Sequence, residues 1–359
     1  MPSSSEAIRP AARRATAVGA FLEGWRRVLG APSLTLGVLA LTFLLALPLA
    51  IALGGMIEDH LGRSRQAERA AWNWNSEWAG EFAASAQGLG PTLTEEIVGF
   101  SGTVSTVSRF LDREPLNPTI AGAVAAYLLL WIFLSGGILD RLARGRPIGL
   151  AAFSAACGVH FFRFLRLGLI VGPAYLVILE GLHPWLFGPL YDRFTRDNDS
   201  EFDAIVIRAA LYLVFLGALA VVNVVADFAR VRAVVEDRRS MLATVGASLR
   251  FIRRRPMRVA GLYLLNVIAF LAIVRLWYSL APSAWAPVWL AFLSAQIYLL
   301  LRVWARLSFI ASEIVFFQGE LAHAGYTAAP PARWPDSPAV EALATLTADA
   351  VRERPSNLL

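Results

Sequence analysis

Long uncharged apolar runs alternate with shorter polar segments along the whole chain. A membrane-spanning helix needs about 20 apolar residues to cross a hydrocarbon core about 30 Å thick. Runs of this kind cover residues 31–57, 117–139, 167–190, 209–226, 259–274 and 286–301, and Glu180 is the one Asp, Glu, Lys or Arg inside them. The pattern predicts an all-α fold, a polytopic transmembrane helical bundle of about six spans.

Composition supports the membrane class. Hydrophobic residues make up 57% of the chain and charged residues 17%, whereas soluble domains have about 45–50% and about 25%. The net charge of +6 could suggest a nucleic-acid partner, but the arginines stand in short blocks beside the apolar runs. Such blocks are typical of topology determinants and of contacts with anionic lipid headgroups. We therefore expect membrane lipids as partners and no nucleic acid.

The distribution of arginines predicts the orientation. Basic residues are dense before the first run, between the second and third runs, and between the fourth and fifth runs. The connection between the third and fourth runs is acidic, with Asp192, Asp197, Asp199, Glu201 and Asp203. By the positive-inside rule, both termini face the cytoplasm and the first, third and fifth connections lie outside. The expected location is a bacterial inner membrane.

Similar segments recur along the chain. An amphipathic, arginine-bearing segment precedes each odd-numbered span, ending at Arg27, Arg166 and Arg255. Each even-numbered span ends on an Ala-Arg pair, namely Ala143-Arg144, Ala229-Arg230 and Ala305-Arg306, and Asp140 and Asp227 stand just upstream of the first two. The pattern favours three parallel units, each with a cytoplasmic interfacial helix and two spans. The alternative is that any six-span protein with basic inner connections carries arginines at these places.

The fourth connection also carries a family resemblance. Its sequence from Ala229-Arg230 through Glu236-Asp237-Arg238-Arg239-Ser240 and Ala247-Ser248-Leu249-Arg250 to Pro256-Met257-Arg258 resembles the linker in the membrane domain of bacterial glycerophosphodiester phosphodiesterases and of six-span bacterial proteins related to them. Residues 305–313 resemble a decayed second copy. The resemblance covers about a third of the chain and implies a membrane fold. It implies no reaction, because no segment here is long enough for the phosphodiesterase domain.

The domain organisation follows from these spans. Residues 1–30 form a cytoplasmic amphipathic segment, residues 31–325 form the membrane domain, and residues 326–359 form a mobile cytoplasmic tail. A periplasmic insert at 58–116 interrupts the membrane domain, and its apolar spacing predicts two amphipathic helices. The insert is either a docking surface or lid, or a helical hairpin that packs on the bundle or lies in the membrane interface.

Ionisable residues at the rims of the spans are candidate site residues, because charge inside a bilayer is expensive. Glu180 and His183 share a helical face near the outer end of the third span, and Glu58, Asp59 and His60 lie at the outer end of the first. If these ends meet, the five residues could bind a divalent metal or relay protons. The alternative is that they are ordinary interfacial polar ends.

Other polar residues have simpler expected roles. We expect lipid-headgroup contacts from Arg163, Arg166, Arg253, Arg254 and Arg255. Within the spans, Asn223, Asn266 and Gln296 are expected to form interhelical hydrogen bonds. Glu313 is expected to pair with an arginine.

Two classes of function remain open from the sequence. One is lipid handling or transport, and the other is a scaffold that engages partners through the insert or the basic inner face. An enzyme is disfavoured, because no nucleophile motif, phosphate-binding loop or His/Cys array is present. We expect no cofactor and no catalytic residues. A protein partner or a second copy of the chain fits either class.

Overall fold

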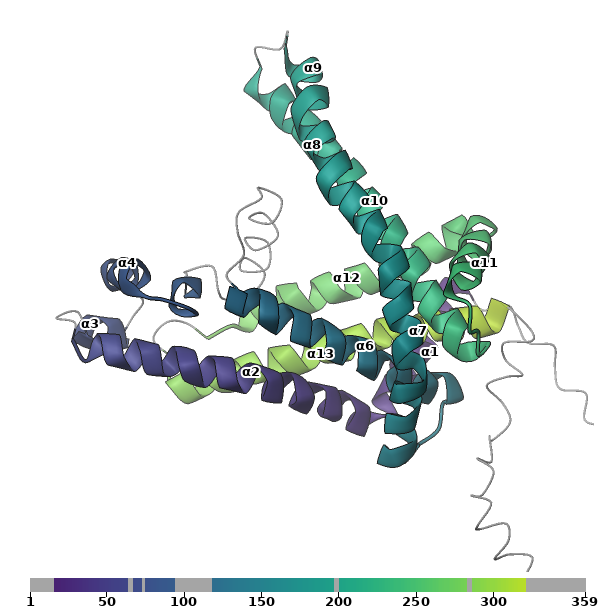
Figure 1. Cartoon of the computed structure of the whole chain (residues 1–359), viewed down its shortest axis with the longest axis horizontal. Coiled ribbons are helices and arrows are strands. Elements are labelled where there is room, and N and C mark those ends of the chain that lie inside the picture. The colour runs from purple at the N-terminus through teal and green to yellow at the C-terminus, as the bar shows by residue number, and fades with distance from the viewer. Residues whose placement is uncertain are drawn as a thin grey trace, which may run out of the picture.

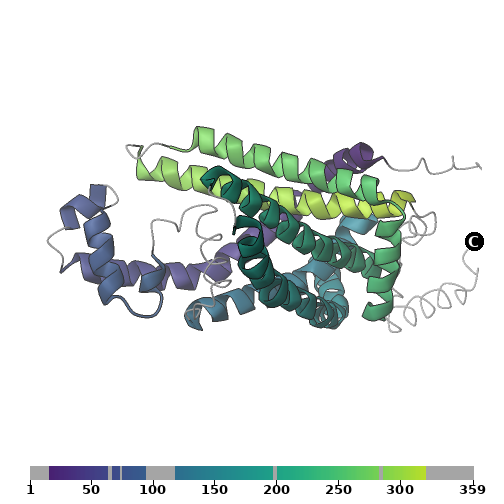
Figure 2. The same cartoon turned by 90° about the horizontal axis from the view of Figure 1, so that it is seen from above.

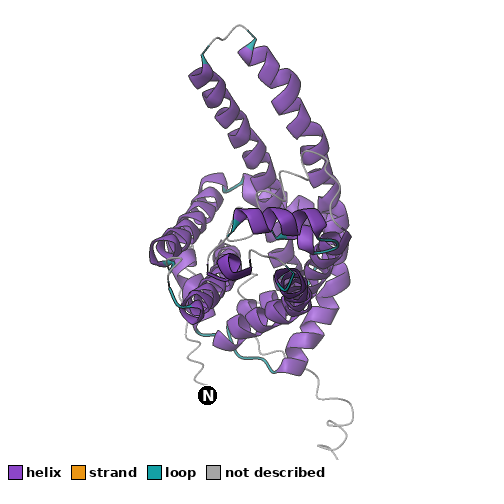
Figure 3. Cartoon of the chain, turned by 90° about the vertical axis from the view of Figure 1, so that its left-hand side faces the viewer, coloured by secondary structure: helices purple, strands orange, loops and turns teal. Residues whose placement is uncertain are grey.

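The computed structural model describes residues 16–63, 67–72, 75–93, 118–196, 200–282 and 286–320. This described part is helical throughout, without strands (Figure 3). The long helices are α2 (Pro32–Leu61), α6 (Pro118–Arg144), α7 (Leu150–Leu176), α10 (Glu201–Val235), α12 (Pro256–Leu280) and α13 (Val288–Glu320). The shorter helices include α1 (Ala17–Leu29) and α11 (Met241–Arg253).

Five helices in the described ranges are long and apolar enough to cross a membrane. They are α2, α6, α10, α12 and the helix from Leu150 to Thr195, which contains α7. The last of these continues beyond α7 through the π-helices η3 (Val177–Leu182) and η4 (Leu186–Leu190), with α8 (His183–Trp185) between them and α9 (Tyr191–Thr195) at the end. The chain is therefore a multi-pass membrane protein by the length and composition of its helices.

The long helices run back and forth from one common end of the molecule. At this end, which we call the basal end, α6, α10 and α13 finish at Arg144, Val235 and Glu320, and α2, α7 and α12 begin at Pro32, Leu150 and Pro256. Helices α12 and α13 lie side by side (Figure 2). The hairpin of α7 and α10 diverges from α2, α6, α12 and α13 (Figure 1).

The hydrophobic core lies at the basal end. It joins α1 and α11 to the basal parts of the long helices, and its fully buried side chains include Val28, Ile138, Phe228, Leu307 and Phe316. Away from this end, apolar side chains are exposed, such as Leu169 at 71% and Leu213 at 73%. A bilayer would cover such residues, so the low burial of the outer parts fits the membrane class.

Helix α1 packs unusually closely against α13. Thr16 caps α1, because its side-chain oxygen accepts a hydrogen bond from the Gly19 N–H at 3.0 Å. Ala20, Gly24 and Val28 then form the buried face of the helix. A Cβ atom at Gly24 would lie 2.5 Å from the backbone nitrogen of Ser312 in α13. Only glycine permits this approach of the two backbones.

One expectation about interfacial helices is wrong. The segments ending near Arg27 and Arg255 form the separate helices α1 and α11, but residues 158–166 lie inside the continuous helix α7. The physical reason is proline. Pro32 and Pro256 begin α2 and α12, and proline disfavours the helical conformation in the residue before it. No proline follows Arg166 until Pro173, which lies inside α7.

The described part of the insert contains α3 (Ala67–Trp72), α4 (Ser76–Ser85) and the 3-10 turn η1 (Gly90–Thr92). Trp78 and Phe82 of α4 are buried, and Trp78 donates a hydrogen bond to His60 at the end of α2. The predicted second amphipathic helix of the insert, residues 1–15 and the predicted tail at 326–359 lie outside the described residues.

Candidate functional site

Two helix junctions at the basal end share one local structure. Helices α1 and α11 each have 13 residues and a hydroxyl N-cap, Thr16 and Ser240, whose oxygen accepts from the N–H three residues on. After each helix come two residues and then a proline that opens a long apolar helix. The residues before the prolines have similar backbone angles, φ −132° and ψ 54° at Ala31 and φ −141° and ψ 44° at Arg255.

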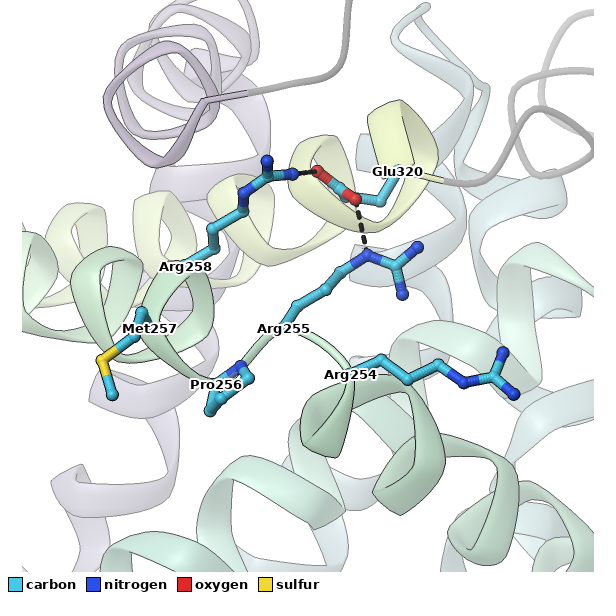
Figure 4. Close-up of a pocket in the computed structure, with 6 residues that line it drawn as sticks. All are labelled: Arg254, Arg255, Pro256, Met257, Arg258 and Glu320. Carbon is cyan, nitrogen blue, oxygen red and sulfur yellow. Dashed lines mark hydrogen bonds and ion pairs between the residues drawn. The ribbon is translucent and has the colours of Figure 1, made fainter.

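The junction of α11 and α12 holds a basic surface pocket. The pocket has a volume of about 500 Å³ and is lined by Arg254, Arg255, Pro256, Met257, Arg258 and Glu320 (Figure 4). Glu320 is the last residue of α13, and its side chain is only 3% exposed. Its carboxylate accepts from Arg255 Nε at 2.5 Å and from Arg258 Nη1 at 2.8 Å. Three arginines and one carboxylate leave the pocket with a net positive charge.

The ion pairs position the pocket's arginines. Arg255 and Arg258 point toward Glu320, whereas Arg254 points away from it (Figure 4). The guanidinium of Arg255 also lies over the Phe251 ring, 4.7 Å from its centroid, which adds a cation–π contact. Because Glu320 holds two arginines in place, the loss of side-chain entropy when they bind an anion is reduced.

The start of α12 adds a second source of positive potential. Pro256 is the first residue of the helix, and no side chain caps it. The first N–H groups of an α-helix have no partner within the helix, and the helix dipole places partial positive charge there. Backbone and side chains therefore both favour an anionic group, such as a phosphate, at this junction.

A second basic pocket lies at the junction of α1 and α2. Its volume is about 270 Å³, and it is lined by Glu23, Arg26, Arg27, Gly30, Arg141, Leu142 and Gly145. This set again contains three arginines and one carboxylate. Helix α2 likewise begins with a proline and without a side-chain cap.

Arg27 ties this second pocket to its surroundings. Its Nη1 donates to the Leu142 carbonyl at 3.1 Å and to Gln318 Oε1 at 3.0 Å, so one side chain joins α1, α6 and α13. Burial lowers the pKa of Arg27, and the neighbouring Glu23 carboxylate partly offsets this effect. Arg26, in contrast, has a side chain that is 86% exposed and is available to a ligand.

The other arginines expected to contact lipid have different surroundings. Arg163 of α7 pairs with Asp237 after α10, with 2.5 Å between Nη1 and Oδ1. Arg166 and Arg253 lie in α7 and at the end of α11, and neither lines one of the two pockets. Of the five predicted residues, Arg254 and Arg255 thus belong to a pocket.

The structure does not bring together the predicted metal cluster. The described ranges include Glu58, Asp59, His60, Glu180 and His183. Within these ranges, no three or more His, Cys, Asp or Glu residues lie close enough together to hold a metal ion. His60 Nδ1 instead accepts a hydrogen bond from Trp78 Nε1 at 3.1 Å, and His183 packs against Phe187 and Phe215. The reason is the divergence of the α7–α10 hairpin from α2 (Figure 1).

A partly buried polar network lies between α10, α12 and α13, and the sequence indicated only some of its members. The Tyr263 hydroxyl oxygen lies 3.2 Å from Asp227 Oδ2 and 2.5 Å from Glu313 Oε1. Asp227 also forms an ion pair with Arg230. Glu313 therefore has a tyrosine as its partner in place of the expected arginine. A tyrosine within an apolar run is common, so the sequence did not indicate this contact.

The neighbouring polar contacts agree with the sequence. Asn266 Nδ2 donates to Ser312 Oγ at 3.0 Å, and the Tyr175 hydroxyl donates to Asn223 Oδ1 at 2.6 Å. The interhelical hydrogen bonds expected of Asn223 and Asn266 are therefore confirmed, whereas the prediction for Gln296 is not. Arg306 of α13 donates to the Tyr127 hydroxyl at 2.9 Å and lies over the Trp131 ring of α6, 3.4 Å from its centroid.

Comparisons with known proteins do not assign the chain to a family. No family model, curated protein or solved structure matches it.

Proposed function

We propose that this protein handles membrane lipids without catalysing a reaction, and that it binds anionic headgroups in the two basic pockets at the basal end. The observation that carries the proposal is the repetition of one arrangement. Each pocket has three arginines and one carboxylate and adjoins an uncapped long helix that begins with proline. A phosphate-bearing headgroup fits this combination of guanidinium groups and helix N–H groups.

We further propose a membrane arrangement that matches this role. In it, α13 is a sixth span, the basal end faces the cytoplasm of a bacterium, and the protein lies in the inner membrane. The two matched junctions are copies of one repeated unit, and α7 is a third copy in which the short helix and the span have fused for lack of a proline. Anionic lipids of the cytoplasmic leaflet would then meet both pockets.

Lipid binding is expected to depend on the arginines that have no buried partner. In neutral detergent, added short-chain phosphatidylglycerol should raise the Tm of the protein in a concentration-dependent way. Arg254→Gln and Arg26→Gln should each weaken the apparent affinity roughly fivefold, because one arginine near an anionic surface contributes about 1 kcal/mol. The double variant should lose both contributions, and salt should weaken binding to the wild type.

Arg239→Gln provides the matched control for this experiment. Arg239 is exposed and near the basal end, between α10 and α11, but it lines neither pocket. Its substitution removes the same charge and should leave the affinity unchanged. If it weakens binding as much as Arg254→Gln does, the attraction is a general surface effect and the pockets are not binding sites. Equal stabilisation by phosphatidylcholine would also contradict the proposal.

The proposed orientation has its own test. In a Cys157→Ala background, Ala83→Cys on the exposed face of α4 should react with a membrane-impermeant maleimide applied to the periplasm. Arg239→Cys should react only after the inner membrane is permeabilised. The reverse pattern would place the basal end outside and remove it from the anionic cytoplasmic leaflet.

A further inference from the structure

We propose that the carboxyl groups of Asp227 and Glu313 form a proton-binding site, in which one proton is held on Glu313 within a hydrogen-bonded chain from Glu313 through Tyr263 to Asp227. The inference does not depend on lipid binding, because it rests on a different part of the molecule. Glu313 is 2% exposed, and the three side chains come from α13, α12 and α10.

The two contacts of the Tyr263 oxygen need one more proton than its hydroxyl supplies. The Tyr263 oxygen lies within hydrogen-bond distance of one oxygen from each carboxyl group, 3.2 Å from Asp227 and 2.5 Å from Glu313. Two such contacts need two protons, and a tyrosine hydroxyl has one. An ionised carboxylate can only accept hydrogen bonds. The second proton must therefore belong to one of the two carboxyl groups.

Charge pairing identifies which group carries this proton. The other oxygen of Asp227 forms an ion pair with Arg230, so Asp227 is ionised. Glu313 then donates to the Tyr263 oxygen, and Tyr263 donates to Asp227. Two neighbouring carboxyl groups in a partly buried site commonly share one proton, because ionising both brings like charges together.

The elements packed around Glu313 supply few other charges. Helix α10 presents Asp227 and Arg230, and α12 presents Tyr263. Arg306, on α13 itself, is engaged with Tyr127 and Trp131 of α6. The charged side chains of α1 near α13 are Glu23 and Arg27, and Arg27 bonds to Leu142 and Gln318. The part of α2 that contributes buried residues is uncharged, with Leu34, Thr35 and Val38.

Release of the proton would change the balance of these charges. Glu313 and Asp227 would then both be negative on either side of Tyr263, with Arg230 as the paired cation. Arg306 lies about two helical turns before Glu313 on the same helix, and the hydrogen-bond partner described for it is the Tyr127 hydroxyl of α6. The site could in this way couple proton uptake to the contact between α13 and α6.

Infrared spectroscopy tests the proposal directly. At pH 7 the wild-type protein in detergent should show the carbonyl-stretch band of a buried carboxylic acid, shifted slightly in D₂O. The band should be absent in Glu313→Gln. Tyr263→Phe should retain the band at a changed frequency, because it removes the hydrogen bond to Glu313 but keeps the carboxyl group; this variant also covers the case in which Glu313→Gln does not fold.

Glu320→Gln is the matched control. Glu320 belongs to the same helix and its side chain is only 3% exposed, but its carboxylate pairs with two arginines. It should be ionised, and its replacement should leave the band intact. A wild-type spectrum without the band, or a band that survives Glu313→Gln, would overturn the proposal. Loss of the band in Glu320→Gln but not in Glu313→Gln would place the proton on Glu320, and this result would also overturn the proposal.

Discussion

The Gly24→Ala variant is expected to lose much of its stability. The added Cβ would lie 2.5 Å from the backbone nitrogen and 2.7 Å from the Cα of Ser312. Backbone atoms inside a packed helix cannot turn away as the end of a flexible side chain can, so α1 and α13 must separate. Overpacking of a core commonly costs about 1–3 kcal/mol, and a backbone collision at this distance should reach about 3 kcal/mol.

The chain contains its own reporter for this measurement. Cys157 is the one cysteine in the sequence, and it is fully buried between α6 and α7. A thiol-reactive dye that fluoresces on labelling therefore reports unfolding during a temperature ramp in detergent. Gly24→Ala should lower the Tm by several degrees and should speed labelling at a fixed temperature.

Gly37→Ala is the control for the Gly24 experiment. Gly37 lies in α2, and no heavy atom would come within 4 Å of an added Cβ there. Alanine is a better helix former than glycine by about 1 kcal/mol, so this variant should be unchanged or slightly more stable. A Gly24→Ala protein as stable as Gly37→Ala would show that the close contact between α1 and α13 is absent from the folded protein.

The sequence predicted the helical class and most of the long helices well. Apolar runs as clear as residues 31–57 and 209–226 leave no competing structure in a membrane, and both are found inside α2 and α10. In the structure, proline stands at the starts of α2 and α12, whereas no proline follows Arg166 before Pro173, and the interfacial helix expected there is part of α7. The ends of the apolar runs did not mark the ends of the helices, because the run at 209–226 lies inside α10, which extends from Glu201 to Val235.

Relations between helices were harder to predict. The expected meeting of His60 and His183 required α2 and α7 to remain adjacent along their length, and one sequence contains no information on the angle between two apolar helices. The role of Tyr263 could not be predicted for a similar reason. A tyrosine in a span is common, and only the helix packing brings it next to Asp227 and Glu313. In the sequence, Asp140 and Asp227 indicate only a repeated pattern before the Ala-Arg pairs, and they predict no contact with Tyr263 or Glu313.

Removal of Asp227 is expected to have the second large effect on stability. Asp227→Ala would leave Arg230 without its carboxylate and Tyr263 without an acceptor. The side chains of Asp227 and Arg230 are 21% and 29% exposed, so water can replace only part of what is lost. Breaking a buried ion pair by removing one partner costs about 3–5 kcal/mol. Because this pair is partly exposed, we expect the free energy of unfolding to fall by about 3 kcal/mol, the lower end of that range.

A double variant separates the ion pair from simple loss of packing. In Asp227→Ala with Arg230→Met, the unpaired charge is gone and an apolar side chain of similar length fills its place, so the Tm should recover most of the loss. Exposed Glu201→Ala, on the same helix, should change stability little. If the double variant is no more stable than Asp227→Ala alone, the cost arises from the cavity and from Tyr263. The role of Arg230 as the counter-ion that keeps Asp227 ionised would then be wrong, and the proton assigned to Glu313 could equally lie on Asp227.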